Sequence, residues 1–76
     1  MLPILRGDRL IGRIDPLFDR GAGVLRVHSV YAEEEATPAD GAAAAKAIGE
    51  LAAWLGASDI AFGRTVPASW RRALRA

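Results

Sequence analysis

Apolar and polar residues alternate along the first part of the chain, which predicts a β-hairpin. Leu2–Arg6 and Arg9–Asp15 are apolar-rich runs separated by Gly7-Asp8, and glycine at the first loop position suits a two-residue type II′ turn. The loop length sets the expected pairs Arg6–Arg9, Leu5–Leu10 and Ile4–Ile11. Period-two alternation then assigns one face to the core and the other to solvent. The expected core face carries Leu10, Gly12 and Ile14, and the outward face carries Arg9, Ile11, Arg13 and Asp15.

A third strand is predicted after a loop. Pro16 is expected to end the second strand, because proline cannot donate a hydrogen bond to a sheet. Residues 16–23 then form a loop in which Leu17 and Phe18 pack at the edge of the core. Val24–Tyr31 has the clearest strand pattern of the chain. Three consecutive antiparallel strands are the simplest arrangement.

An amphipathic helix follows an acidic linker. Thr37 is a natural N-cap, Pro38 suits the first helical position, and Asp40 lies three residues after the cap. Gly56 is the expected C-terminal stop. The apolar stripe predicted to face the sheet consists of Ala44, Ala47, Ile48, Leu51, Trp54 and Leu55.

The last quarter of the chain predicts one more strand and a short helix. Asp59–Phe62 is a strand that is expected to join the sheet beside an existing one. Pro67 opens the final helix, with Trp70, Ala73 and Leu74 facing inward. Residues 1–76 therefore form a single small α+β domain with the element order βββαβα.

Composition and charge narrow the class of protein. The chain has no cysteine and no apolar run of 18 or more residues, which predicts a cytoplasmic protein without a membrane span. The net charge of +1 is unevenly distributed: residues 32–63 carry one Lys against six Asp or Glu, and residues 64–76 carry four Arg and no acid. Basic ends and an acidic middle fit a domain with one basic face.

The chain has few residues that could act as catalytic groups. His28 is the single histidine, and there is no asparagine or glutamine. Ser29 follows His28 on a strand, so their side chains point to opposite faces and cannot form a nucleophile–base pair. The consecutive glutamates Glu33–Glu35 lack the histidine spacing of a metal site. We therefore expect no metal, no cofactor and no enzymatic activity of this chain alone.

Arginines are the candidate functional residues. Arg6, Arg9 and Arg13 share the predicted outward face, and Arg26 extends it onto the third strand. Like charges placed opposite each other in a hairpin are unfavourable. Two explanations fit this arrangement: nearby aspartates neutralise the arginines, or the arginines bind a phosphate backbone that lies on this face. These four arginines are the candidate DNA-backbone contacts.

The N-terminal half resembles a known family. Leu-Pro-Ile-Leu-Arg-Gly-Asp-Arg-Leu-Ile-Gly-Arg-Ile-Asp at residues 2–15, followed by Asp19-Arg20 and the strand at 24–27, is similar to the C-terminal part of the winged-helix crosslink-repair DNA glycosylases (YcaQ/AlkZ-like). The resemblance continues through Leu51–Gly56 and covers nearly the whole chain.

The resemblance implies an accessory role in DNA repair. Members of the family carry tandem winged-helix domains ahead of this region and use a Gln-x-Gln motif for catalysis, without a metal or organic cofactor. This chain contains no glutamine, so the motif has no counterpart here. The implied partners are duplex DNA and winged-helix domains. The alternative is a structural interaction or dimerisation module, forming a homo-oligomer or docking a partner, with Phe18 and Trp70 as its surface anchors.

Overall fold

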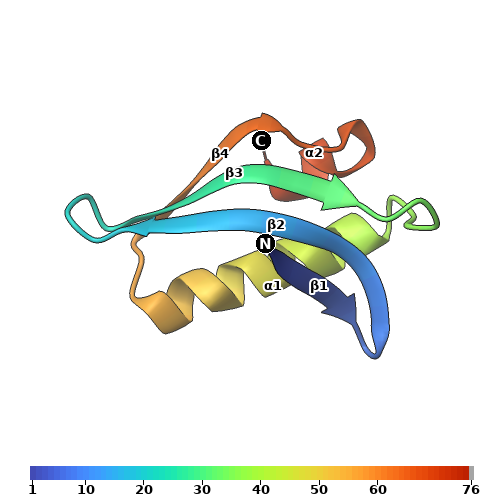
Figure 1. Cartoon of the computed structure of the whole chain (residues 1–76), viewed down its shortest axis with the longest axis horizontal. Coiled ribbons are helices and arrows are strands. Elements are labelled where there is room, and N and C mark those ends of the chain that lie inside the picture. The colour runs from blue at the N-terminus through green and yellow to red at the C-terminus, as the bar shows by residue number, and fades with distance from the viewer. Residues whose placement is uncertain (76) are drawn as a thin grey trace.

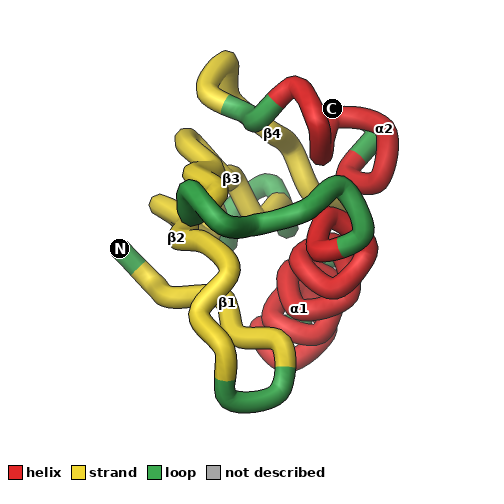
Figure 2. Tube along the Cα trace, turned by 90° about the vertical axis from the view of Figure 1, so that its right-hand side faces the viewer, coloured by secondary structure: helices red, strands yellow, loops and turns green. Residues whose placement is uncertain are grey.

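The protein folds into a four-stranded sheet with helices on one face. The computed structural model describes residues 1–75. Its elements are β1 (Leu2–Arg6), β2 (Arg9–Asp19), β3 (Val24–Ala32), α1 (Asp40–Leu55), β4 (Asp59–Thr65), a 3₁₀ turn (Ala68–Trp70) and α2 (Arg71–Leu74). This order confirms the predicted α+β class. Both helices lie on the same side of the sheet, and the other side is bare (Figures 1 and 2).

The sheet order is β1-β2-β3-β4. β1, β2 and β3 form the predicted antiparallel meander, and β4 pairs with β3 in parallel. A parallel pair needs a crossover connection, which α1 provides by packing across one face of the sheet (Figure 1). β2 and β3 are the two central strands.

Two β-bulges shift the alternation of core and solvent positions. The hairpin pairs Arg6 with Arg9 and Leu5 with Leu10 as predicted, but Ile4 pairs with Gly12, which leaves Ile11 as an extra residue on β2. Ile11, Gly12 and Ile14 are all buried, whereas Leu10 is exposed. The prediction that Ile11 faces outward and Leu10 faces the core is therefore wrong.

The second bulge lies where β2 contains a proline. Pairing passes from Asp15–Ser29 to Pro16–Val27, so His28 is the unpaired residue on β3. Pro16 does not end the strand as predicted, since a bulge tolerates the missing N–H, and β2 continues to Asp19. On β3 the bulge moves Val30 to the core side.

α1 packs closely on the sheet through small side chains. Its buried apolar positions are Ala44, Ile48 and Ala52, four residues apart. Trp54 was predicted to share this stripe but is 82% exposed, because it projects from the side of the helix rather than toward the sheet. Gly56 ends the helix in the predicted left-handed conformation, with φ of 80°.

Trp70 is the central side chain of the core. It has no exposed surface, and its indole lies against Gly12 of β2 and Gly41 of α1. A Cβ atom at either glycine would approach the ring to about 3.0 Å, which is tighter than ordinary van der Waals contact, and at Gly12 it would also clash with the backbone carbonyl of Tyr31. These two glycines therefore make room for the tryptophan between sheet and helix.

Among the described residues, no helix is long and apolar enough to cross a bilayer.

Candidate functional site

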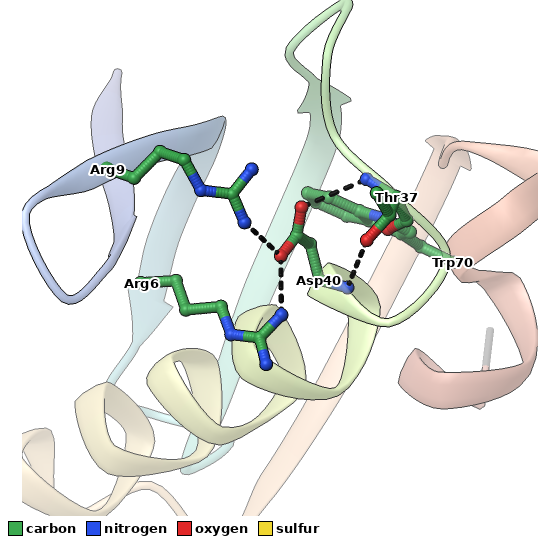
Figure 3. Close-up of polar contacts among 5 residues, drawn as sticks. All are labelled: Arg6, Arg9, Thr37, Asp40 and Trp70. Carbon is green, nitrogen blue, oxygen red and sulfur yellow. Dashed lines mark hydrogen bonds and ion pairs between the residues drawn. The ribbon is translucent and has the colours of Figure 1, made fainter.

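A buried carboxylate joins two of the predicted arginines to the start of α1. Arg6 Nη1 donates to Asp40 Oδ1 at 2.8 Å, and Arg9 Nη2 donates to the same oxygen at 2.7 Å (Figure 3). The Asp40 side chain has no exposed surface, while the two arginine side chains are about half exposed. One acid therefore neutralises the like charges that face each other at the end of the hairpin.

The turn before α1 positions Asp40. The backbone N–H of Thr37 donates to Asp40 Oδ2 at 2.9 Å, and Asp40 N–H donates to Thr37 Oγ1 at 3.3 Å, which is the reciprocal pattern of a capping box. Trp70 Nε1 donates to the Thr37 carbonyl at 3.0 Å (Figure 3). The predicted capping pair is thus present, although the helix itself begins at Asp40 rather than Pro38.

These contacts keep Asp40 ionised. The hydrogen bond from the Thr37 backbone, the hydrogen bond from Arg6 and the charge of Arg9 lower the pKa of Asp40 from 3.8 to about 2. At neutral pH the cluster therefore consists of two cations and one anion. Arg9 also borders a hollow whose other walls include Glu33, Glu34 and Glu35, so an approaching phosphate would meet three acids there.

The pKa of Asp40 predicts acid sensitivity. Because its folded pKa is depressed, the carboxylate contributes stability above its ordinary pKa near 3.8, and this contribution is lost as the pH falls toward 2. We expect the urea midpoint to fall in this window and to fall less steeply in Asp40→Asn, which cannot titrate. Equal slopes for the two proteins between pH 4 and 2 would contradict this role of Asp40. Asp19, whose pKa is also lowered by its hydrogen bonds, is common to both proteins.

The bulge at Ile11 separates the predicted basic face into two. Arg6 lies two residues from the buried Ile4, and Arg9 pairs with Arg6, so both extend toward the helix side, where Asp40 binds them. Arg13 lies between Gly12 and Ile14 and points to the bare face of the sheet. The prediction that Arg6, Arg9 and Arg13 share one outward face is therefore wrong.

The other two candidate arginines are on the bare face and also have acidic neighbours. Arg13 Nε lies 3.6 Å from Glu33 Oε1, and Arg26 Nη2 lies 3.3 Å from Asp19 Oδ2. All four side chains involved are exposed or partly exposed, and such pairs contribute little to stability. They nevertheless reduce the free positive charge of Arg13 and Arg26.

The two predicted surface anchors have different environments. Trp70 is fully buried, so it cannot anchor a partner, and this prediction is corrected: its indole fills the gap between Gly12 and Gly41. Phe18 is partly buried and packs against the core, whereas Leu17, which was predicted to pack there as well, is 56% exposed. The most exposed aromatic side chain described is instead Trp54.

The C-terminal arginines are a basic set that the sequence-based site did not include. The set consists of Arg64, which lies on β4, and Arg71, Arg72 and Arg75 in and directly after α2. All four are exposed. Among the described residues, no side-chain carboxylate lies within 4.0 Å of any of them. The absence of any acid after Asp59 was the signal in the sequence that indicated this excess of positive charge.

A groove of about 520 Å³ lies between α1, β4 and α2. Its walls are mostly apolar, with Ile48, Ile60, Phe62 and Leu74 among them, and Asp59 and Arg75 are the charged residues that line it. No group of three or more potential metal ligands occurs within residues 1–75.

Comparisons with protein-family models, with curated proteins and with solved structures find no match for this chain. The family resemblance of the sequence therefore stays a prediction.

Proposed function

We propose that this chain is a non-catalytic accessory domain of a winged-helix DNA-repair glycosylase-like protein, which contacts the DNA backbone through its C-terminal arginines. Its role is electrostatic positioning of duplex DNA in the cytoplasm, next to winged-helix domains that carry out the chemistry. The supporting observation is the exposure of Arg64, Arg71, Arg72 and Arg75 without a carboxylate partner among the described residues.

The distribution of charge favours this surface over the hairpin. Arg6 and Arg9 are bound by Asp40, and the glutamates at 33–35 lie beside Arg9. The C-terminal arginines instead end a segment without acids. Exposed guanidinium groups are suited to phosphate, because their planar N–H donors match two phosphate oxygens and their charge is permanent.

The structure of α2 favours nucleic acid over a lipid surface. A helix that binds a membrane interface places an apolar face among the lipids. The apolar side chains at this end of the domain, Trp70 and Leu74, are buried in the core. The exposed residues of α2 therefore offer charge without an apolar anchor.

Binding to DNA should be strongly salt-dependent. With four phosphate contacts, the affinity for a labelled duplex should fall roughly 150-fold between about 50 and 200 mM salt. The triple variant Arg71→Gln/Arg72→Gln/Arg75→Gln keeps one contact, so its affinity should fall only about fourfold over the same range. Fluorescence anisotropy measures both.

A matched control removes the same charge elsewhere. Arg13→Gln/Arg20→Gln/Arg26→Gln has the same net charge as the α2 variant but leaves the C-terminal arginines intact. We expect it to retain most of the wild-type affinity and salt slope. If this control loses more DNA affinity than the α2 variant, the DNA contact lies on the sheet face and not at the C-terminal arginines. If the wild-type protein does not bind the duplex at about 50 mM salt, the proposed function is refuted.

A further inference from the structure

The bare face of the sheet carries an ordered row of side chains on each central strand. Because the bulge at Ile11 takes up one residue, the outward positions of β2 follow one another at regular spacing. In chain order they are Leu10, Arg13, Asp15 and Leu17, all of them exposed. The row therefore reads apolar, basic, acidic, apolar.

β3 carries a second row at the same levels. The strand pairing sets Tyr31 beside Arg13, Ser29 beside Asp15 and Arg26 beside Leu17. The backbone N–H of Glu33 donates to the Ile11 carbonyl at 2.9 Å, which extends the row by one level. From that end to the other, the β3 row reads acidic, aromatic, hydroxyl, basic.

Both rows are self-complementary about the same level. A two-fold axis parallel to the sheet, perpendicular to its strands and level with Ile14 turns each strand onto an antiparallel copy of itself. On β2 it sets Arg13 against Asp15 of the partner subunit, and Leu10 against Leu17 of the partner subunit. On β3 it sets Arg26 against Glu33 of the partner subunit, and Tyr31 against Ser29 of the partner subunit. We propose that this face binds a second copy of the chain, forming a two-fold symmetric dimer.

The size of the face suits a stable dimer. The domain measures 37 × 25 × 19 Å, and the bare face spans the two longer directions (Figures 1 and 2). The face is therefore large enough to bury about 800 Å² of accessible surface per subunit, as a specific interface does. Stacked sheets pack with their strands within roughly 30° of each other, which allows the antiparallel alignment of the two β2 strands.

The exposed apolar residues are placed where such a dimer would bury them. Leu10, Leu17 and Tyr31 are 43%, 56% and 42% exposed on this face, and Leu5, which pairs with Leu10, is 54% exposed. The ion pairs of Arg13 and Arg26 within the chain are 3.6 and 3.3 Å long. Strong charge-assisted hydrogen bonds are about 2.7–2.9 Å long, so both arginines can exchange these weak partners for ones in the second copy.

Charge reversal and its rescue test the dimer. In sedimentation equilibrium of the full chain without DNA, wild type should weigh twice the 8.1 kDa monomer. Arg13→Asp and Asp15→Arg should each raise the dimer Kd by about tenfold or more, because each places like charges together across the interface. The double variant Arg13→Asp/Asp15→Arg restores opposite charges and should return the Kd to near the wild-type value.

The outcomes are distinct from those of the DNA measurement. Trp54→Ala removes the most exposed apolar side chain of the helix side and should leave the dimer Kd unchanged. If the wild-type protein stays monomeric at about 200 μM, the proposal is overturned, and a winged-helix domain becomes the expected partner of the bare face. Loss of association in the double variant, with its circular dichroism unchanged, or loss in Trp54→Ala alone would also overturn it. DNA affinity at the α2 surface enters none of these readouts.

Discussion

Asp40→Ala is expected to be the most destabilising single substitution of a polar residue in this domain. It leaves Arg6 and Arg9 facing each other at the end of the hairpin without the acid that now binds both. It also removes the acceptor for the Thr37 N–H at the start of α1. Although both arginines are about half exposed, the loss of three accepted hydrogen bonds and the two like charges left in proximity place this change among the more costly surface-linked substitutions. We expect the melting temperature to fall by roughly 10 °C or more.

Two comparisons identify the reason for this loss. Thr37→Ala removes the other half of the capping box and should cost only about 1 kcal/mol. Arg6→Gln/Arg9→Gln/Asp40→Asn removes all three charges, and it should be more stable than Asp40→Ala because it leaves no unpaired cation and keeps an amide to accept the Thr37 N–H. Thermal melts of the three variants give their order of stability. An Asp40→Ala domain as stable as Thr37→Ala would show that the arginine contacts contribute nothing.

Trp70→Ala is expected to unfold a large part of the population at 25 °C. The side chain is fully buried between sheet and helix, and truncating a buried tryptophan costs about 3–5 kcal/mol. A domain of this size rarely has more than about 3–5 kcal/mol of net stability. Gly12 and Gly41, whose missing side chains accommodate the indole, would then border a void. Near-UV circular dichroism and urea melts measure the loss.

Trp70→Phe is the matched control. It keeps an aromatic ring in the gap but loses the hydrogen bond to the Thr37 carbonyl. We expect an intermediate loss of stability with the folded state retained. Melting curves of Trp70→Ala that match wild type would exclude the indole as the centre of the core.

Much of the fold could be predicted from local patterns. The hairpin turn, the pairing of Arg6 with Arg9 and the end of α1 at Gly56 follow from glycine chemistry and strand spacing, and the structure confirms them. The meander likewise follows from short connections between alternating segments.

The bulges could not be predicted from alternation. Ile11 and Ile14 are three residues apart, which a regular strand places on opposite faces and a bulge places on the same one. The assignment of Arg6 and Arg9 to the outward face failed for this reason. Their partner, Asp40, lies 34 and 31 residues away in the sequence, and its local role as a capping residue gave no sign of this ion pair.

Helix periodicity also placed one residue wrongly. The three- and four-residue spacing of apolar residues assigned Trp54 to the stripe that faces the sheet, but its side chain is exposed. The structure instead buries the small residues Ala44 and Ala52, because they let α1 approach the sheet closely. The charge of the C-terminal segment could be read from the sequence, but only the fold shows that, among the described residues, no side-chain carboxylate lies within 4.0 Å of its arginines.

Titration of ¹⁵N-labelled protein with an unlabelled duplex at low salt tests the central claim most directly. If the C-terminal arginines contact the DNA backbone, the amide resonances of residues 71–75 and of Arg64 should shift, and those of residues 6–13 should not. The shifts should disappear as salt is raised, since phosphate contacts are screened. Shifts confined to the hairpin and Arg26, or no shift at about 50 mM salt, would contradict the proposed function.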